Sequence, residues 1–204
     1  MHAGRALAAV LALTGPPGCT SGPPRNPDDV CDIFEERRSW YRASKRSAER
    51  WGVPIPVQMA LVHQESRFRS DAKAPRRRIL WIFPGPRVSS AYGYAQALEE
   101  TWSEYQRNTG NGGADRDDFG DSVDFIGWYA ARGAARGSAP PSDPFRFYLA
   151  YHEGHGGYLR NTHSGKPWLL RVARKVERRA GTYSAQLTTC QERLDRPRFR
   201  LWPF

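Results

Sequence analysis

The chain has 204 residues, with 31 Lys and Arg against 21 Asp and Glu and a sequence pI near 9.9. This length fits one domain with its own core and argues against several. The formal net charge of +10 argues against basic partners and favours nucleic acid, anionic lipid or another anionic polymer, among which charge does not choose.

The first 19 residues have the pattern of an export signal. A basic start precedes an apolar run from Ala6 to Leu13, too short to span a bilayer, and small residues lead to Cys19. This end resembles the lipobox of bacterial lipoproteins, although Pro16 and Pro17 depart from its preferred aliphatic residue. We therefore expect export to the periplasm and an outer-membrane anchor at a lipidated Cys19. A plain secretory signal, with Cys19 removed or left free, is the alternative.

Two further cysteines, Cys31 and Cys190, remain if Cys19 is lipidated or removed. In an oxidising compartment we expect them to form a disulfide that joins the two ends of the domain. Closing so long a loop would stabilise the fold by about 4 kcal/mol or more in the chain-entropy model. The alternative is two separate free thiols.

Proline, glycine and polar residues divide the chain into a tether, a domain and a tail. Residues 20–29 contain nothing to bury, which predicts a flexible tether. The domain covers residues 30–195, and residues 196–204 form a basic aromatic tail. Helical patterning opens the domain and runs from Val30 to Trp51. Its inward stripe consists of Ile33, Trp40, Tyr41 and Ala48.

A second helix begins near Pro56, whose missing N–H is harmless in a first turn. Residues 74–89 follow as a long loop with prolines around a hydrophobic middle. Further helices are expected over Leu98–Arg107, Asp121–Arg132, Pro144–Tyr151 and Trp168–Leu194. Because no run shows the alternation typical of strands, the predicted class is mainly α, a single domain with long loops.

The helix that follows Pro56 carries an unexpected carboxylate. At 3.6 residues per turn, Val57, Leu61, Glu65 and Phe68 share one stripe, so Glu65 stands where an apolar side chain was due. Burial would raise the pKa of this carboxyl and suit it to general acid catalysis near neutral pH. A frayed helix end, with Glu65 in solvent or paired with a nearby arginine such as Arg67 or Arg69, explains the pattern equally well.

Three stretches in order resemble the lytic transglycosylase SLT domain family: ESRFRSDA from Glu65, AYGYAQALEETW from Ala91 and LAYHEGHGGY from Leu149. The family's motifs are E-S-x-F, G-x-x-Q and A-Y-N-A-G. The resemblance covers roughly residues 50–165. It implies a lysozyme-like fold, with the loops arranged around a groove for the glycan strands of peptidoglycan.

The resemblance also implies a role for each matching residue. Glu65 would be the catalytic residue, Gln96 would line the groove, and Tyr151 would hydrogen-bond Glu65. The expected substrate-binding residues are Ser66, Ser89, Ser90, Tyr92, Gln96, Tyr151, His152 and Glu153. His152 and Glu153 depart from the family's usual Asn and Ala, and the interval before GYAQ is longer than usual.

In the family's reaction one Glu protonates the bond between N-acetylmuramic acid and N-acetylglucosamine. The same Glu then takes a proton from the muramoyl 6-hydroxyl as that oxygen attacks C1, which leaves a 1,6-anhydro end. A second carboxylate, which most glycosidases need, is dispensable here. The resemblance thus implies no cofactor, a monomer that acts on peptidoglycan, and a membrane contact through the lipid anchor. Export argues against nucleic acid as a partner.

Three alternatives stay open. A second carboxylate would make the protein a hydrolase similar to goose-type lysozyme: Asp71 is more typical of a turn, and Glu153 is better placed unless it only pairs with Arg160. A glycan-binding envelope lipoprotein without catalysis would use the same groove. The net charge and the RPRFRLWPF tail also allow a nucleic-acid binder, which would require steep salt dependence.

Two other patterns favour structure over chemistry. His152, Glu153 and His155 do not have the H-E-x-x-H spacing of a zinc site, so we expect no metal. Trp102 and Trp128 fall within amphipathic helices, where core packing is more common than stacking on a sugar.

Overall fold

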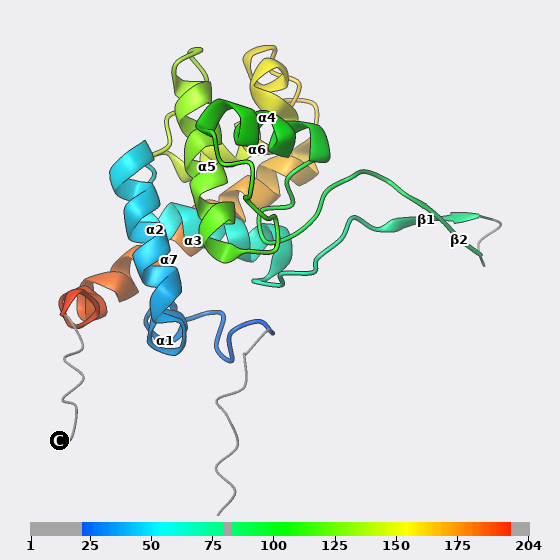
Figure 1. Cartoon of the computed structure of the whole chain (residues 1–204). Helices are drawn as coiled ribbons and strands as arrows, with labels where there is room; N and C mark the ends of the chain where they lie inside the picture. Colours follow the sequence, from blue (N-terminus) through cyan, green and yellow to red (C-terminus); the bar gives the residue numbers. More distant parts are fainter. Residues whose placement is uncertain (1–21, 80–82, 197–204) are drawn as a thin grey trace, which may run out of the picture.

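The computed structural model describes residues 22–79 and 83–196. This part of the chain contains seven helices and one two-stranded hairpin, joined by loops (Figure 1). The elements are α1 Val30–Glu36, α2 Arg38–Trp51, α3 Ile55–Ser66, β1 Arg76–Ile79, β2 Phe83–Arg87, α4 Glu99–Thr109, α5 Phe119–Ala134, α6 Pro144–Leu159 and α7 Pro167–Asp195. The prediction of a mainly helical domain is therefore confirmed.

Helix α3 lies at the centre of the fold, where it contacts α2, α5 and α7. Val57, Leu61 and Phe68 are buried, as the stripe predicts, and Met59 and Val62 on other faces are buried as well. A helix enclosed on nearly every side needs partners for its polar side chains. The amide nitrogen of buried Gln58 has such partners, because it donates to the carbonyls of Val53 at 2.8 Å and Ser44 at 3.1 Å.

Helix α7 has 29 residues and crosses the whole molecule, passing α6 and α3 before it ends beside α1 (Figure 1). Its buried side chains recur every three or four positions, which keeps one apolar face toward the core along the full length. They are Leu169, Ala173, Val176, Ala180, Tyr183, Leu187, Cys190 and Leu194. Because α7 contacts α1, the end of the domain lies next to its start.

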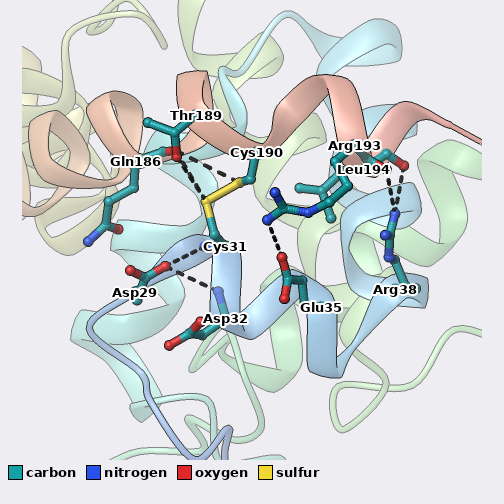
Figure 2. Close-up of polar contacts among 10 residues, drawn as sticks. All are labelled: Asp29, Cys31, Asp32, Glu35, Arg38, Gln186, Thr189, Cys190, Arg193 and Leu194. Carbon is teal, nitrogen blue, oxygen red and sulfur yellow. Dashed lines mark hydrogen bonds and ion pairs between the residues drawn. A yellow bond between two sulfur atoms is a disulfide. The ribbon is translucent and has the colours of Figure 1, made fainter.

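Figure 2 shows how α1 is joined to the end of α7. A disulfide connects Cys31 to Cys190, and Glu35 forms an ion pair with Arg193. Arg38 Nη1 donates to the Leu194 carbonyl at 2.9 Å and so occupies one of the acceptors that a helix end leaves without a partner. Asp29 accepts hydrogen bonds from the first turn of α1. The N-terminal helix is therefore held by covalent and polar contacts together.

Residues 22–29 differ from the expectation that they have nothing to bury. Pro24 is buried, Asp28 forms an ion pair with Arg179, and the Tyr183 hydroxyl donates to the Pro27 carbonyl. The described part of the predicted tether thus packs on α7. The helical run from Val30 to Trp51 is also broken at Arg37, which has φ −125° and ψ 67°.

The segment 74–89, expected as a loop, contains the antiparallel hairpin β1–β2. The hairpin extends away from the helices (Figure 1). Because the hairpin lies away from the helices, packing on the core does not impose the alternation by which strands are recognised. Prolines in β2 are tolerated, since a two-stranded sheet has only edge strands.

Some expectations concern residues outside the described ranges: the signal segment with Cys19, and all of the tail except Arg196. Among the helices that are described, none has the length and apolar character needed to cross a membrane.

Candidate active site

Glu65 lies in the last turn of α3, at a helix end fixed by an unusual backbone. Arg67 (φ 52°) and Phe68 (φ 61°) both adopt the left-handed conformation, which costs an L-residue on the order of 1–2 kcal/mol each. Phe68 is fully buried, with its ring centroid 5.8 Å from those of Trp40 and His63, and this burial offsets the strain. A frayed end is therefore the wrong interpretation.

The surroundings of Glu65 disfavour its charge. Burial raises its pKa to about 7, and the hydrogen bond from Tyr148 lowers it by less. The negative end of the α3 dipole acts in the same direction as burial. The side chain still keeps some exposed surface. Near neutral pH this carboxyl can both donate and accept a proton.

The tyrosine that forms a hydrogen bond with Glu65 is Tyr148, whereas the resemblance implied Tyr151. The Tyr151 hydroxyl donates to the Ala95 carbonyl at 2.7 Å. Burial and then the nearby Glu65 raise the pKa of both tyrosines, so both hydroxyls stay protonated. Tyr148 was missed, although it shares a face of α6 with Tyr151 and His152 at helical spacing, a signal that could have identified it.

A groove of about 250 Å³ lies next to Tyr151. Its lining residues are Gln96, Ala97, Leu98, Thr101, Phe125, Tyr129, Tyr151, His152, Glu153 and Gly154. It brings together four residues that were expected to bind substrate: Gln96, Tyr151, His152 and Glu153. A larger hollow of about 470 Å³ between α2 and the end of α7 contains none of them.

The loop that carries Gln96 depends on Gly93. Gly93 has φ 78°, and a Cβ there would lie 1.9 Å from the Arg116 carbonyl oxygen, so only glycine fits. Gln96 Nε2 donates to the carbonyls of Ala72 and Gly93, both at 2.9 Å. Gln96 thus braces the loop and lines the groove at once.

Helix α6 continues to Leu159, beyond the predicted end at Tyr151, and it bends at Gly154. Gly154 has φ 72° and ψ 155°, a conformation essentially restricted to glycine. The bend follows directly after His152 and Glu153, and it also separates them from His155. Among the described residues no group of three or more His, Cys, Asp or Glu side chains could hold a metal ion.

Glu153 is held in place by its neighbours. Both carboxylate oxygens accept from Lys166 Nζ at 2.8 Å, and the Thr162 hydroxyl and His152 Nδ1 (3.1 Å) also contact them. Its side chain is only 4% exposed. The hydrogen bond from Lys166, then that from Thr162, lowers its pKa to about 2. Its partner is Lys166, so the alternative of a pairing with Arg160 is wrong.

Four other residues expected to bind substrate lie elsewhere. Ser66 is buried, and its hydroxyl donates to the Val62 carbonyl at 3.1 Å, so it faces its own helix. Ser89 Oγ accepts from Ala91 N at 3.4 Å, and Ser90 Oγ accepts from Glu99 N at 3.1 Å at the start of α4. The Tyr92 hydroxyl donates to Asp117 at 3.0 Å. These contacts give the four residues structural roles outside the groove.

One comparison with known proteins gives a match. A family model described as Transglycosylase SLT domain matches residues 6–190. No curated protein and no solved structure matches the chain.

Proposed function

Since the chain belongs to the transglycosylase SLT domain family, we propose that it is a lytic transglycosylase of peptidoglycan with Glu65 as its catalytic residue. The family and the lysozyme-like helical domain support action on the glycan strands. The observation that carries the assignment of Glu65 is its place at the fixed end of α3, next to Tyr151, which lines the groove. Burial there raises its pKa to about 7.

In the proposed reaction Glu65 passes its proton to the glycosidic oxygen between N-acetylmuramic acid and N-acetylglucosamine. The C1–O bond breaks, and positive charge develops at C1. The Glu65 carboxylate then takes the proton of the muramoyl 6-hydroxyl as its oxygen bonds to C1. The product carries a 1,6-anhydro ring, Glu65 regains its proton, and no water is consumed.

The state of Glu153 supports this reaction over hydrolysis. A hydrolase needs a second carboxylate that can act as a base or a nucleophile. Glu153 is the one carboxylate among the described residues that line the groove, and both of its oxygens already accept hydrogen bonds. A pKa of about 2 also makes it a weak base. Asp71 is exposed and paired with Arg69 at 3.5 Å.

The test is a digestion of purified sacculi by wild type and Glu65→Gln, with mass spectrometry of the released ends. Wild type should leave 1,6-anhydro ends, and Glu65→Gln should leave almost none. Glu49→Gln, which removes an exposed carboxylate on α2, is the matched control and should act as wild type. Reducing-end muramic acid from wild type, or equal activity of Glu65→Gln, would contradict the proposal.

We also propose that the protein is exported to the periplasm and anchored in the outer membrane through Cys19. The basic and apolar start of the chain and its lipobox-like end support this location. Metabolic labelling with palmitate should mark wild type but not Cys19→Ala. Equal labelling of the two would contradict the anchor.

A further inference from the structure

Trp168 stands out among the aromatic side chains that the structure describes, because it is 48% exposed. Trp102 and Trp128, the two tryptophans considered for sugar stacking, are buried in the core. A single exposed apolar side chain needs no explanation by itself, so the place of Trp168 beside the groove is what makes it informative. The indole of Trp168 meets the His152 ring edge-on, with centroids 5.2 Å apart, and His152 lines the groove.

The position of Trp168 is set by the ion pair between Glu153 and Lys166. Lys166 is the residue before α7, and Trp168 is the second residue of that helix. Glu153 lies on α6, so the pair ties the start of α7 to the wall of the groove. Glu153 also contacts His152 Nδ1 at 3.1 Å, so the same carboxylate positions both rings.

The two rings continue a line that starts at Glu65. The Tyr148 hydroxyl bonds Glu65, and the Tyr148 ring lies 6.4 Å from that of His152, which in turn contacts Trp168. The acid, the groove wall and the exposed indole are thus consecutive neighbours. Because His152 lines the groove and Trp168 is exposed next to it, a glycan strand in the groove can reach both rings.

We propose that Trp168 and His152 form a binding platform for an N-acetylated pyranose of the glycan strand, and that Glu153 and Lys166 position it. The indole offers a flat apolar face to the C–H face of the ring, while the imidazole offers a polar edge to hydroxyl or acetamido groups. His152 and Glu153, the residues at which the chain departs from the family's A-Y-N-A-G pattern, thus belong to the platform and to its support. This inference rests on the proposed function.

Binding can be measured apart from cleavage by placing each change in the Glu65→Gln background. Isothermal titration with peptide-free glycan strands from purified peptidoglycan should give about tenfold weaker binding for Trp168→Ala, and about threefold or less for Trp168→Phe. Leu159→Ala, at an equally exposed apolar residue of α6, is the matched control and should bind normally. Unchanged binding by Trp168→Ala, or an equal loss from Leu159→Ala, would overturn the platform.

A double-mutant cycle tests the positioning role. Lys166→Met alone should weaken binding about threefold, but it should have almost no further effect when Trp168 is already Ala, because the pair acts through the indole. Additive losses would refute positioning through Trp168. If Trp168→Ala weakens binding while the parent chain with Glu65 releases no anhydro ends, the platform holds and the transglycosylase proposal fails.

Discussion

Glu65 on α3 and Glu153 on α6 are both carboxylates, and their surroundings shift their pKa values in opposite directions. Glu65 meets apolar packing and the negative end of α3, and its pKa rises to about 7. Glu153 meets Lys166, Thr162 and His152, and its pKa falls to about 2. The comparison teaches that partners decide the role of a carboxylate near a groove: burial with few partners makes an acid, and several donors make a structural anion.

The largest effect expected from this comparison is on cleavage. Glu65→Gln should lower kcat about a thousandfold, roughly 4 kcal/mol, because the proton donor is lost. Glu153→Gln should keep kcat within about threefold and raise KM, since it disturbs only the proposed platform. Initial rates on soluble glycan strands measure both. A thousandfold loss of kcat in Glu153→Gln would reverse the two assignments.

Stability should depend on pH with opposite signs at the two sites. Glu65 has a folded pKa of about 7 against an ordinary 4.5, so the folded chain binds the extra proton and its stability falls as pH rises from 4.5 to 7. Glu65→Gln should therefore unfold at a higher urea concentration than wild type at pH 8, with a free energy of unfolding that is larger by up to about 3 kcal/mol. At pH 4 the two should have the same stability.

At Glu153 the stability depends on pH in the opposite direction. Its folded pKa of about 2 lies below 4.5, so its contribution is present above pH 4.5 and is lost as pH falls toward 2. Urea titrations of wild type, Glu65→Gln and Glu153→Gln between pH 3 and pH 8 separate the contributions of the two glutamates to the pH dependence of stability. If Glu65→Gln is no more stable than wild type at pH 8, the raised pKa of Glu65 is wrong.

The sequence predicted the fold well where one face of a helix is buried. The 3.6-residue spacing located α4, α5 and α7 to within a few residues, because burial imposes that period. The second half of α6 was missed since Gly154, Gly156 and Gly157 are typical of breaks, and only the first of them bends the helix. The hairpin was missed because it lies off the core.

The candidate site was less predictable than the fold. The stripe identified Glu65 as poised for burial, since one helix contains that information. Tyr148 and Tyr151 lie on the same face of α6, and which of them reaches Glu65 depends on how α6 is placed relative to α3. The Lys166 partner of Glu153 lies beyond a turn of the chain, whose path short-range patterns do not reveal.

A smaller effect is expected from Lys166→Met. Removing the cation leaves the buried Glu153 carboxylate with its weaker donors, at a cost of about 2 kcal/mol at pH 7. The acid loss of stability should also move to higher pH, since Lys166 is the largest cause of the lowered pKa of Glu153. Thermal unfolding measures both, with Lys175→Met, at an exposed residue of α7, as the control. Equal midpoints for the two variants would show that the ion pair contributes little.

The smallest effect is expected from Ser66→Ala, next to Glu65. The Ser66 hydroxyl is buried and donates to the Val62 carbonyl, an acceptor that is already part of α3, so its removal should cost less than about 1 kcal/mol. Cleavage should stay within about twofold of wild type, and the alkaline limb of the kcat profile, set by the pKa of Glu65, should not move. A shift of that limb would mean that Ser66 helps to hold the proton on Glu65. The contrast with Glu153 would then no longer rest on burial and the helix dipole alone, because Glu65 would owe its proton to a specific acceptor.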